Sequence, residues 1–421
     1  MKPIQLISPV DGSVYAERMP LSAEAAQAAV ARARAAQKPW AARPLAERIA
    51  LVKAGVANLN AMKDVVVEEL AWQMGRPTRF SGEFGGVNAR TAYMSDIAAA
   101  TLSPTMVEDS GAFRRFIARE ALGVVFIVAP WNYPYLTTIN TLVPALIAGN
   151  TVVLKHASQT MLVGERLAEA FHAGGIPADV FQNVVLDHAT TEHLIGARAF
   201  NFVNFTGSVG GGQAMERAAA GTFTPLGLEL GGKDPGYVRA DANLEAAIDT
   251  LMDGAMYNAG QCCCGIERIY VHESLYDAFV EGAVKWVSAL KLGNPFDAET
   301  TLGPMANKRF AAVVRGQVAE ATGANAFFVR AGKLYTPTPD CFLDGITRQT
   351  VIDLARRRGI EVIEQAIWPE ELESFEQFFL TGSAAEVTAV QSAGPWNFEV
   401  GDMTRQLARD YDDLVNRRAN F

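Results

Sequence analysis

The sequence predicts an α/β protein built on a parallel sheet. Four short β-branched runs, VVFIVA (124–129), TVVLK (151–155), FQNVVL (181–186) and FVNFTG (202–207), alternate with helical stretches such as MLVGERLAEAFHAGG. Strands that alternate with helices indicate parallel strands joined by helical crossovers. The chain has 421 residues and is 49% hydrophobic, so it can bury a large core in about two or three domains.

Two helices are expected before the first of these strands. The segment SAEAAQAAVARARAAQKPW is rich in alanine and begins with Ser22 as the expected N-cap. The next segment carries apolar residues three and four positions apart, the period of a helix with one buried face. These residues are Leu45, Ile49, Val52, Val56 and Leu59.

Composition excludes several classes of partner. The formal net charge is -9, from 37 basic and 46 acidic residues, and no basic run stands out. We therefore expect no nucleic-acid partner, because such binding needs clustered Lys and Arg. The start, MKPIQLISPVDGS, lacks the layout of a signal peptide, and no run of about 18 apolar residues predicts a membrane span. Four cysteines, three of them contiguous, favour a soluble cytoplasmic protein with reduced thiols.

The turns after the predicted strands carry the candidate ligand-binding residues, because ligands of such sheets bind beyond the carboxyl ends of the strands. PWNYP presents Asn132, and Lys155 is followed by Ser158. The turn TGSVGGG (206–212) leads into a helix expected near Gln213, whose backbone N–H groups can take a phosphate. Glu229 ends an apolar run before two glycines. Taken singly, each of these features is also compatible with a purely structural role.

Three adjacent cysteines in YNAGQCCCGIERIYV (257–271) raise the question of chemistry. Residue type alone leaves three alternatives: buried apolar filler, part of a metal site, or a nucleophile with two neighbours.

The order PWNYP, VLKHAS, FTGSVGGG, LELGGKDP and NAGQCCCGIER resembles the aldehyde dehydrogenase superfamily, from about residue 6 to about residue 318. The resemblance implies that Cys263 is the nucleophile. Cys262 and Cys264 are expected to be packing residues, since free cysteine behaves as a small hydrophobe, and no metal is expected. A thiolate would add to the aldehyde so that a hydride can leave for nicotinamide. The side-chain amide of Asn132, with the N–H of Cys263, would hold the oxyanion, and Glu229 would activate the water that hydrolyses the thioester.

The same resemblance implies a binding site for NAD or NADP. Lys155 would hold the adenosine ribose, and Thr206 would pack near the nicotinamide. Many members that favour NAD carry Glu where this chain has Ser158. Serine removes the repulsion of a 2′-phosphate without adding a positive charge, which favours NAD slightly and leaves NADP open. The full expected set is Trp131, Lys155, Ser158, Thr206, Gly207, Ser208 and Leu230.

The resemblance ends soon after TTLGPMANKRFAAVVRGQVAEAT, and an E-x-F-G-P-like motif expected of the family is missing. From about residue 318 to 421 the chain instead resembles the carboxyl-terminal part of branched-chain aminotransferases. The family's Schiff-base lysine has no counterpart, since Lys333 matches no family lysine, so pyridoxal phosphate is not expected. By position, the residues corresponding to that family's cofactor contacts are Glu320, Leu343, Ile346, Thr347 and Ser383.

We therefore expect three parts. Residues 1–229 form a Rossmann-like dinucleotide-binding domain with an oligomerisation hairpin near 103–122. Residues 230–318 form part of a catalytic domain whose apolar face lacks its usual cover, and residues 319–421 form the aminotransferase-like segment. The expected activity is NAD(P)-dependent oxidation of a small aldehyde, weakened by the replaced carboxyl-terminal part, in a homo-oligomer. Two alternatives are a non-catalytic NAD(P)-binding fusion and an aminotransferase-related protein.

Overall fold

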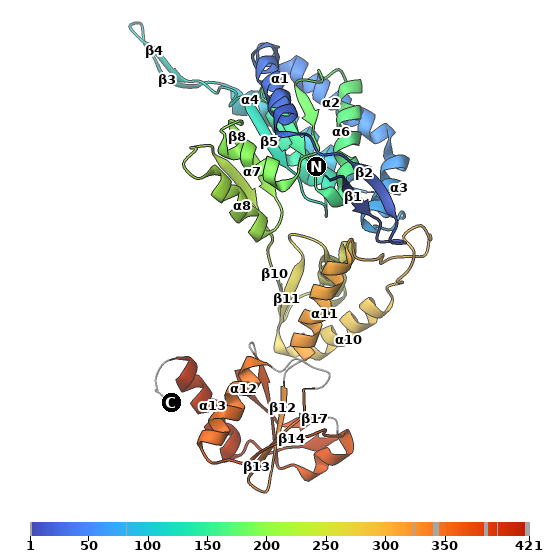
Figure 1. The fold of residues 1–421 in the computed structure, drawn as a ribbon, viewed down its shortest axis with the longest axis vertical. Coiled ribbons are helices and arrows are strands. Elements are labelled where there is room, and N and C mark those ends of the chain that lie inside the picture. Colours follow the sequence, from blue (N-terminus) through green and yellow to red (C-terminus); the bar gives the residue numbers. More distant parts are fainter. Residues whose placement is uncertain are drawn as a thin grey trace. The chain divides into compact units, whose positions relative to one another are not determined.

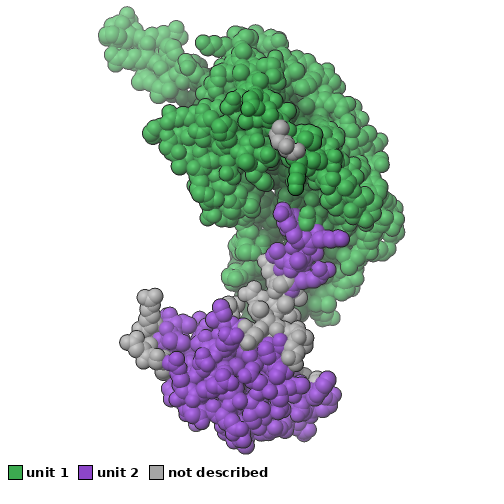
Figure 2. All heavy atoms as spheres, viewed as in Figure 1, with its two compact units in different colours: residues 1–307 green, residues 308–421 purple. Residues whose placement is uncertain are grey.

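A computed structural model describes residues 2–80, 82–322, 325–339, 345–382, 386–393 and 395–416. The chain forms two compact units, residues 1–307 and residues 308–421 (Figures 1 and 2). The junction expected near residue 318 falls inside the first helix of the second unit, α11 (Lys308–Thr322).

The first unit is organised around a five-stranded sheet in the order β7-β6-β5-β8-β9, in which all neighbours are parallel. This confirms the predicted α/β class and parallel sheet. The run 181–186 forms a shorter strand than its composition suggests. The strands are β5 (Val124–Val128), β6 (Thr151–Lys155), β7 (Phe181–Asn183), β8 (Phe202–Thr206) and β9 (Leu226–Glu229).

Helices cover both faces of this sheet, so its central strands are buried on both sides. Along β5, Phe126 packs into the core cluster that includes α1, α7 and α8, while Ile127 packs into the cluster that includes α2 to α6. The alternation follows from the two-residue period of a strand. The helices are α1 (Ala23–Ala41), α2 (Leu45–Ala61), α3 (Lys63–Met74), α4 (Phe84–Leu102), α5 (Pro134–Ile147), α6 (Met161–Ala173), α7 (His188–Gly196) and α8 (Val209–Ala219).

Ser22 caps α1 as predicted, because its side chain accepts a hydrogen bond from the Ala25 N–H at 3.2 Å. Two antiparallel ribbons complete this part of the unit: β1 (Ile4–Ile7) with β2 (Val14–Arg18), and β3 (Thr105–Asp109) with β4 (Arg114–Ile117). The second ribbon projects from the unit (Figure 1). It carries exposed apolar side chains, including Val107 and Phe116, at the place expected for the hairpin.

Residues 234–288 form a smaller layer with a thin core. Strand β10 (Asp234–Val238) pairs in parallel with β11 (Ile266–Val271), and the helices α9 (Leu244–Met256) and α10 (Tyr276–Ser288) accompany them. The fully buried apolar side chains of this cluster are Val238, Met252 and Phe279. By contrast Tyr237 and the nearby Leu292 are 72% and 77% exposed. That this layer lacks its usual cover stays a prediction.

The second unit has its own five-stranded sheet, in the order β14-β13-β12-β15-β16. All its pairs are antiparallel except β13 with β14. One face packs with α12 and α13 around Phe327 and Phe379, and the other packs around Phe328 and Phe375. The elements are β12 (Asn325–Arg330), β13 (Lys333–Thr336), α12 (Ile346–Arg357), β14 (Val362–Glu364), β15 (Gln377–Gly382), β16 (Glu386–Val390), β17 (Ser392–Ala393), β18 (Trp396–Asn397) and α13 (Asp402–Val415).

The residues implied by the aminotransferase resemblance are only partly described. Ile346 is 84% exposed, whereas Thr347 is buried with its hydroxyl 3.4 Å from the hydroxyl of Tyr411. Lys333 begins β13 and forms a 2.8 Å ion pair with Glu361. Leu343, Ser383 and the side chain of Glu320 lie outside the described residues.

Candidate active site

The candidate residues lie where the sheet's strands end. Trp131 and Asn132 follow β5, Lys155 ends β6, Thr206 ends β8 and Glu229 ends β9. These four strands are neighbours in one parallel sheet, so their carboxyl ends share one edge.

The loop before α5 holds the side-chain amide oxygen of Asn132 in place. The side-chain Oδ1 accepts a hydrogen bond from the Tyr133 N–H at 3.0 Å, and Pro134 then starts the helix. Its Nδ2 has no acceptor among the described residues, so two N–H groups remain available. Trp131 is half-buried and packs against the larger core cluster, which anchors the loop.

The three cysteines follow a 3-10 helix, Tyr257–Gly260, in which Asn258 has a φ of 55°. A left-handed conformation is tolerated better by Asn than by most residues, and it turns the chain sharply before the thiols. Cys263 is exposed, and its N–H donates to no group among the described residues. Cys262 is half-buried, as a packing residue should be, but Cys264 is exposed, so the expected packing role of Cys264 is wrong.

The thiols on either side of Cys263 interact with each other. The Sγ atoms of Cys262 and Cys264 lie 3.4 Å apart. Hydrogen bonding to Cys262, followed by burial, raises the pKa of the Cys264 thiol to about 12. Burial, and then contact with Cys262, raises the pKa of the Tyr133 hydroxyl as well. Cys264 and Tyr133 therefore stay protonated at neutral pH.

A short segment after β9 joins the glycine-rich turn to the thiol loop. The Gly207 N–H donates to the carbonyl oxygen of Glu229 at 2.9 Å, and the Gly232 N–H donates to that of Cys263 at 3.0 Å. Thr206 pairs with Glu229 in the sheet register. The Glu229 side chain is exposed. These bonds bring Thr206, Glu229 and Cys263 to adjoining backbone segments.

The glycine-rich turn is shaped by packing as well as by the needs of a ligand. Helix α8 starts at Val209, earlier than the start expected near Gln213, because Ser208 caps it by accepting the Gly211 N–H at 3.2 Å. A Cβ on Gly211 would lie 2.4 Å from the Phe205 ring. With the Ser208 oxygen used as a cap, phosphate binding here would depend on backbone N–H groups.

Two more of the expected cofactor residues pack tightly around this turn. A Cβ on Gly207 would lie 2.6 Å from Cζ of Phe205. Leu230 packs over Gly212, where a Cβ would lie 2.7 Å from its side chain. A side chain at either glycine would therefore have to displace Phe205 or Leu230.

A cavity lies at the end of β6. The described residues that line it are Ile4, Lys155, His156, Ser158, Met161 and 183–186. Lys155 is 8% exposed, and the hydrogen bond of its Nζ is a long one, 3.5 Å to the carbonyl oxygen of His156. Burial lowers the pKa of Lys155. A buried ammonium with one weak partner suits the hydroxyl oxygens of a bound ribose.

His156 was not singled out from the sequence. It is buried, with Nε2 3.3 Å from the Pro134 carbonyl oxygen and Nδ1 3.3 Å from the Thr160 hydroxyl. Burial lowers its pKa to about 4, so the ring is neutral at physiological pH. The string VLKHAS shows a histidine at a strand end, but nothing in the sequence shows that it is buried.

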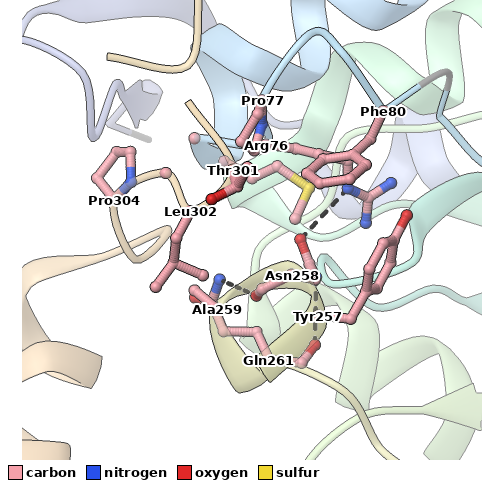
Figure 3. Close-up of a pocket in the computed structure, with 13 residues that line it drawn as sticks. Arg76, Pro77, Phe80, Tyr257, Asn258, Ala259, Gln261, Thr301, Leu302 and Pro304 are labelled. Atoms are coloured by element: carbon pink, nitrogen blue, oxygen red, sulfur yellow. Dashed lines mark hydrogen bonds between the residues drawn. The ribbon is translucent and has the colours of Figure 1, made fainter. Parts of the chain in front are cut away.

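A buried ion pair near the thiol loop was also missed. Arg76 and Glu83 have a 2.7 Å contact, and each side chain is 3% exposed. Arg76 lines a pocket with Tyr257, Asn258 and Gln261 (Figure 3). The segment MGRPTRFSGEFGG has no spacing that reveals these partners.

The alternative of a metal site has partial support from geometry. The three Sγ atoms all lie within 4.8 Å of one another, and no other group of three such ligands occurs among the described residues. No fourth ligand accompanies them in that part of the chain, whereas structural zinc sites are usually four-coordinate.

The fold and site define the class of protein: an α/β protein on a parallel sheet, with an exposed thiol, Cys263, in a loop bonded to the segment after β9. Residues 1–352 match the model of the aldehyde dehydrogenase family. The chain belongs to this family. A succinate-semialdehyde dehydrogenase [NADP(+)] of Mycolicibacterium paratuberculosis is 32% identical over 336 residues, which are 79% of this chain and 71% of that relative.

Solved structures of dehydrogenases are similar to this chain in fold. An NAD-dependent benzaldehyde dehydrogenase from Corynebacterium glutamicum has a TM-score of 0.72 and 26% identity, over 87% of this chain and 81% of that one. An NADP-dependent glyceraldehyde-3-phosphate dehydrogenase from Bacillus halodurans, complexed with NADP, has a TM-score of 0.71 and 28% identity, over 80% and 74%.

The family match reaches residue 352, well beyond the expected limit near 318. These comparisons give no support to the aminotransferase resemblance of the remaining chain, which stays a prediction. Among the described residues, every helix is too short or too polar to cross a bilayer.

Proposed function

We propose that this chain oxidises an aldehyde to a carboxylic acid with NAD(P)+, through a thioester on Cys263. The observation that carries the proposal is a pair of unused donors, the Nδ2 amide of Asn132 and the N–H of the exposed Cys263, which have no acceptor among the described residues. Asn258 joins the two loops that carry them by donating to the Asn132 carbonyl oxygen. Preorganised donors of this kind are what an oxyanion requires.

The chemistry follows from these groups. The Cys263 thiolate adds to the carbonyl carbon, and the π electrons move to the oxygen, which the two donors hold. When the oxyanion collapses, the hydrogen leaves with its electron pair, and bound NAD(P)+ supplies the acceptor. Glu229 then takes a proton from water as the water attacks the thioester carbon, and the carboxylic acid leaves as the thiolate re-forms.

For the cofactor we favour NADP+. None of the described residues that line the cavity at Lys155 carries a carboxylate, and Ser158 presents an exposed hydroxyl there. The mycobacterial relative is described as NADP(+)-dependent. Ser158 alone slightly favours NAD. The positive charge of Lys155, and the lack of a carboxylate among the described residues that line the cavity, outweigh this preference. The residues proposed to hold the cofactor are Trp131, Lys155, Ser158, Thr206, Gly207, Ser208 and Leu230.

The proposed turnover is slow. The sequence has no E-x-F-G-P-like motif to hold the nicotinamide ribose. Misplacement of reacting atoms by about 1 Å can cost on the order of 100-fold in rate. The relatives named above act on different aldehydes, so the proposal stops at the class of substrate.

We also propose that residues 319–421, of which 319–352 lie within the family match, resemble an aminotransferase segment but hold no pyridoxal phosphate. The supporting observation is Lys333, whose Nζ is paired with Glu361 at the start of β13, an inner strand of the second sheet. A visible pyridoxal phosphate absorbance that persists through gel filtration would contradict this. A homo-oligomer joined through the β3–β4 hairpin, and a cytoplasmic location, stay predictions.

The test of the main proposal is reduced-cofactor formation with a panel of simple aldehydes. Wild type should form NADPH slowly, Cys263→Ala should form none, and Cys262→Ala should retain the activity. Equal loss in both variants would argue that the cysteines act by packing. Binding of NADP+ without any turnover in wild type would favour the non-catalytic alternative.

A further inference from the structure

Arg76 joins three parts of the first unit through one guanidinium group. Its Nη1 donates to Glu83 Oε1 at 2.7 Å, and its Nη2 donates to the carbonyl oxygen of Asn132 at 2.6 Å. Its Nε donates to Oδ1 of Asn258 at 3.3 Å. Arg76 therefore contacts both the loop that carries Asn132 and the turn that precedes the cysteines.

Glu83 fixes the guanidinium from the other side. The Oε2 atom of Glu83 accepts the Leu136 N–H at 2.6 Å, in the first turn of α5. Burial raises the pKa of this carboxyl, and Arg76 opposes that shift. Because an arginine fork is planar, a partner at Nη1 also restricts the directions of Nη2 and Nε.

Asn258 carries the connection on to the thiols. Its Nδ2 donates to the same Asn132 carbonyl oxygen at 3.2 Å and to the Gln261 carbonyl oxygen at 3.3 Å. Gln261 in turn donates from Nε2 to the Asn258 carbonyl oxygen at 2.9 Å. Figure 3 shows Arg76, Asn258 and Gln261 linked in this order. Cys262 follows Gln261 directly in the chain.

The backbone beside Arg76 has little freedom to move. Gly75 has a φ of 76°, and a Cβ there would lie 2.6 Å from the Pro304 carbonyl oxygen. A Cβ on Gly303 would lie 1.9 Å from the Gly75 carbonyl oxygen. The two segments therefore pack backbone to backbone, which holds the base of the arginine side chain in place.

We propose that Arg76 is a positioning residue of the oxyanion site, and that it sets the placement of Asn132 and of the Cys263 turn relative to each other. The roles of Asn132 and Cys263 rest on the proposed function. Arg76 itself touches neither the thiol nor the Asn132 amide. It holds the carbonyl oxygen of Asn132, so it fixes the peptide from which the amide projects, and it reaches the thiol turn through Asn258.

A buried arginine can also serve stability alone, and Arg48 offers the matched control. Arg48 is 8% exposed and donates to the carbonyl oxygens of Ile147 and Ala41, at 2.9 Å each, and to that of Arg43. None of these partners belongs to the candidate site. Loss of Arg48 should therefore destabilise the unit without altering the thiol turn.

The experiment compares Arg76→Lys, Arg76→Met and Arg48→Met by their alkylation with iodoacetamide. The measured quantity is the rate at Cys263 relative to Cys262, from tandem mass spectrometry across a range of pH. Both Arg76 variants should lower this ratio by about tenfold, since small displacements have large effects on reactivity. Lysine keeps the charge and one partner but cannot reach all three acceptors. Arg48→Met should leave the ratio unchanged while it lowers the melting temperature.

Asn258→Gly provides an independent route to the same readout. It removes the side chain that links Arg76 to the thiol turn but tolerates the positive φ. We expect the same decrease, about tenfold, in the alkylation rate of Cys263 relative to that of Cys262. An unchanged ratio in Arg76→Lys and Asn258→Gly, or an equal loss in Arg48→Met, would overturn the positioning role. If Arg76→Met does not fold, the labelling ratios of Arg76→Lys, Asn258→Gly and Arg48→Met still test the positioning role. If wild type shows no turnover but the ratio falls as expected, the proposed function fails and the positioning role stands.

Discussion

The Sγ atoms of Cys262 and Cys264 lie 3.4 Å apart, on either side of the exposed Cys263 in the sequence. This contact keeps a proton on the pair, because it raises the pKa of Cys264 to about 12. Cys263 also raises the pKa of Cys264, but less than Cys262 does. The three adjacent thiols are therefore chemically distinct, although the sequence presents them alike.

We expect Cys263 to react with iodoacetamide faster than Cys264, because the thiolate is the nucleophile and Cys264 keeps its proton. We also expect it to react faster than Cys262, because Cys262 is half-buried and Cys263 is exposed. Brief labelling followed by tandem mass spectrometry locates the modified residue within the peptide. Cys262→Ala should release Cys264 from the hydrogen bond and speed its labelling. Uniform labelling of all three in wild type would contradict the assignment of Cys263.

The packing of Phe205 predicts opposite effects for two neighbouring glycines of α8. A Cβ on Gly211 would lie 2.4 Å from the Phe205 ring, whereas a Cβ on Gly210 meets nothing within 4 Å. Gly211→Ala should lower the free energy of unfolding by about 1–3 kcal/mol through overpacking. Gly210→Ala should be neutral or stabilise by up to about 1 kcal/mol, since alanine favours a helix. Urea unfolding of both variants measures the difference, and equal effects would show that Phe205 moves aside.

Several features of this fold could be predicted from local pattern. The β-branched runs after residue 123 predict four of the five strands of the parallel sheet, because a strand buried on both faces is apolar throughout. The cap at Ser22 followed from residue type alone. The order of short motifs carried the family resemblance, and with it the residues of the candidate site.

Other features could not be predicted because they depend on contacts between distant residues. Arg76 and Asn258 are separated by 182 positions, and neither has a local signature. The early start of α8 depends on Ser208, for which the sequence predicts a ligand contact instead, and Gly211 after it is explained by the Phe205 ring. Patterns of residue type show which face is buried, but they do not show which buried polar groups meet.

Lys155 and Ser158 predict how the cofactor is selected. Lys155→Ala should weaken NADP+ binding by about tenfold or more, the usual effect of losing a hydrogen bond from a charged group. Ser158→Glu should weaken NADP+ more than NAD+, by about tenfold, because a carboxylate repels the 2′-phosphate. Ser158→Gln has a similar size without the charge and is the control. Isothermal titration measures each affinity. If Ser158→Glu lost the same amount of affinity for NAD+ and for NADP+, residue 158 would not lie beside the 2′-phosphate.

The last prediction concerns acid stability and depends on His156. The pKa of this ring is about 4 in the folded chain, against 6.5 for an ordinary histidine, because burial disfavours the charged form. Between these two values the unfolded chain binds a proton that the folded chain does not. The stabilisation is therefore fully present above pH 6.5 and is lost as the pH falls toward 4, by about 3 kcal/mol in all. His156→Gln, which retains a donor and an acceptor for Pro134 and Thr160, should lose less stability over the same interval. The exposed His193, changed to Gln, should leave the wild-type pH dependence intact. Urea unfolding at a series of pH values gives all three curves, and parallel curves for wild type and His156→Gln would show that His156 is protonated in the folded chain.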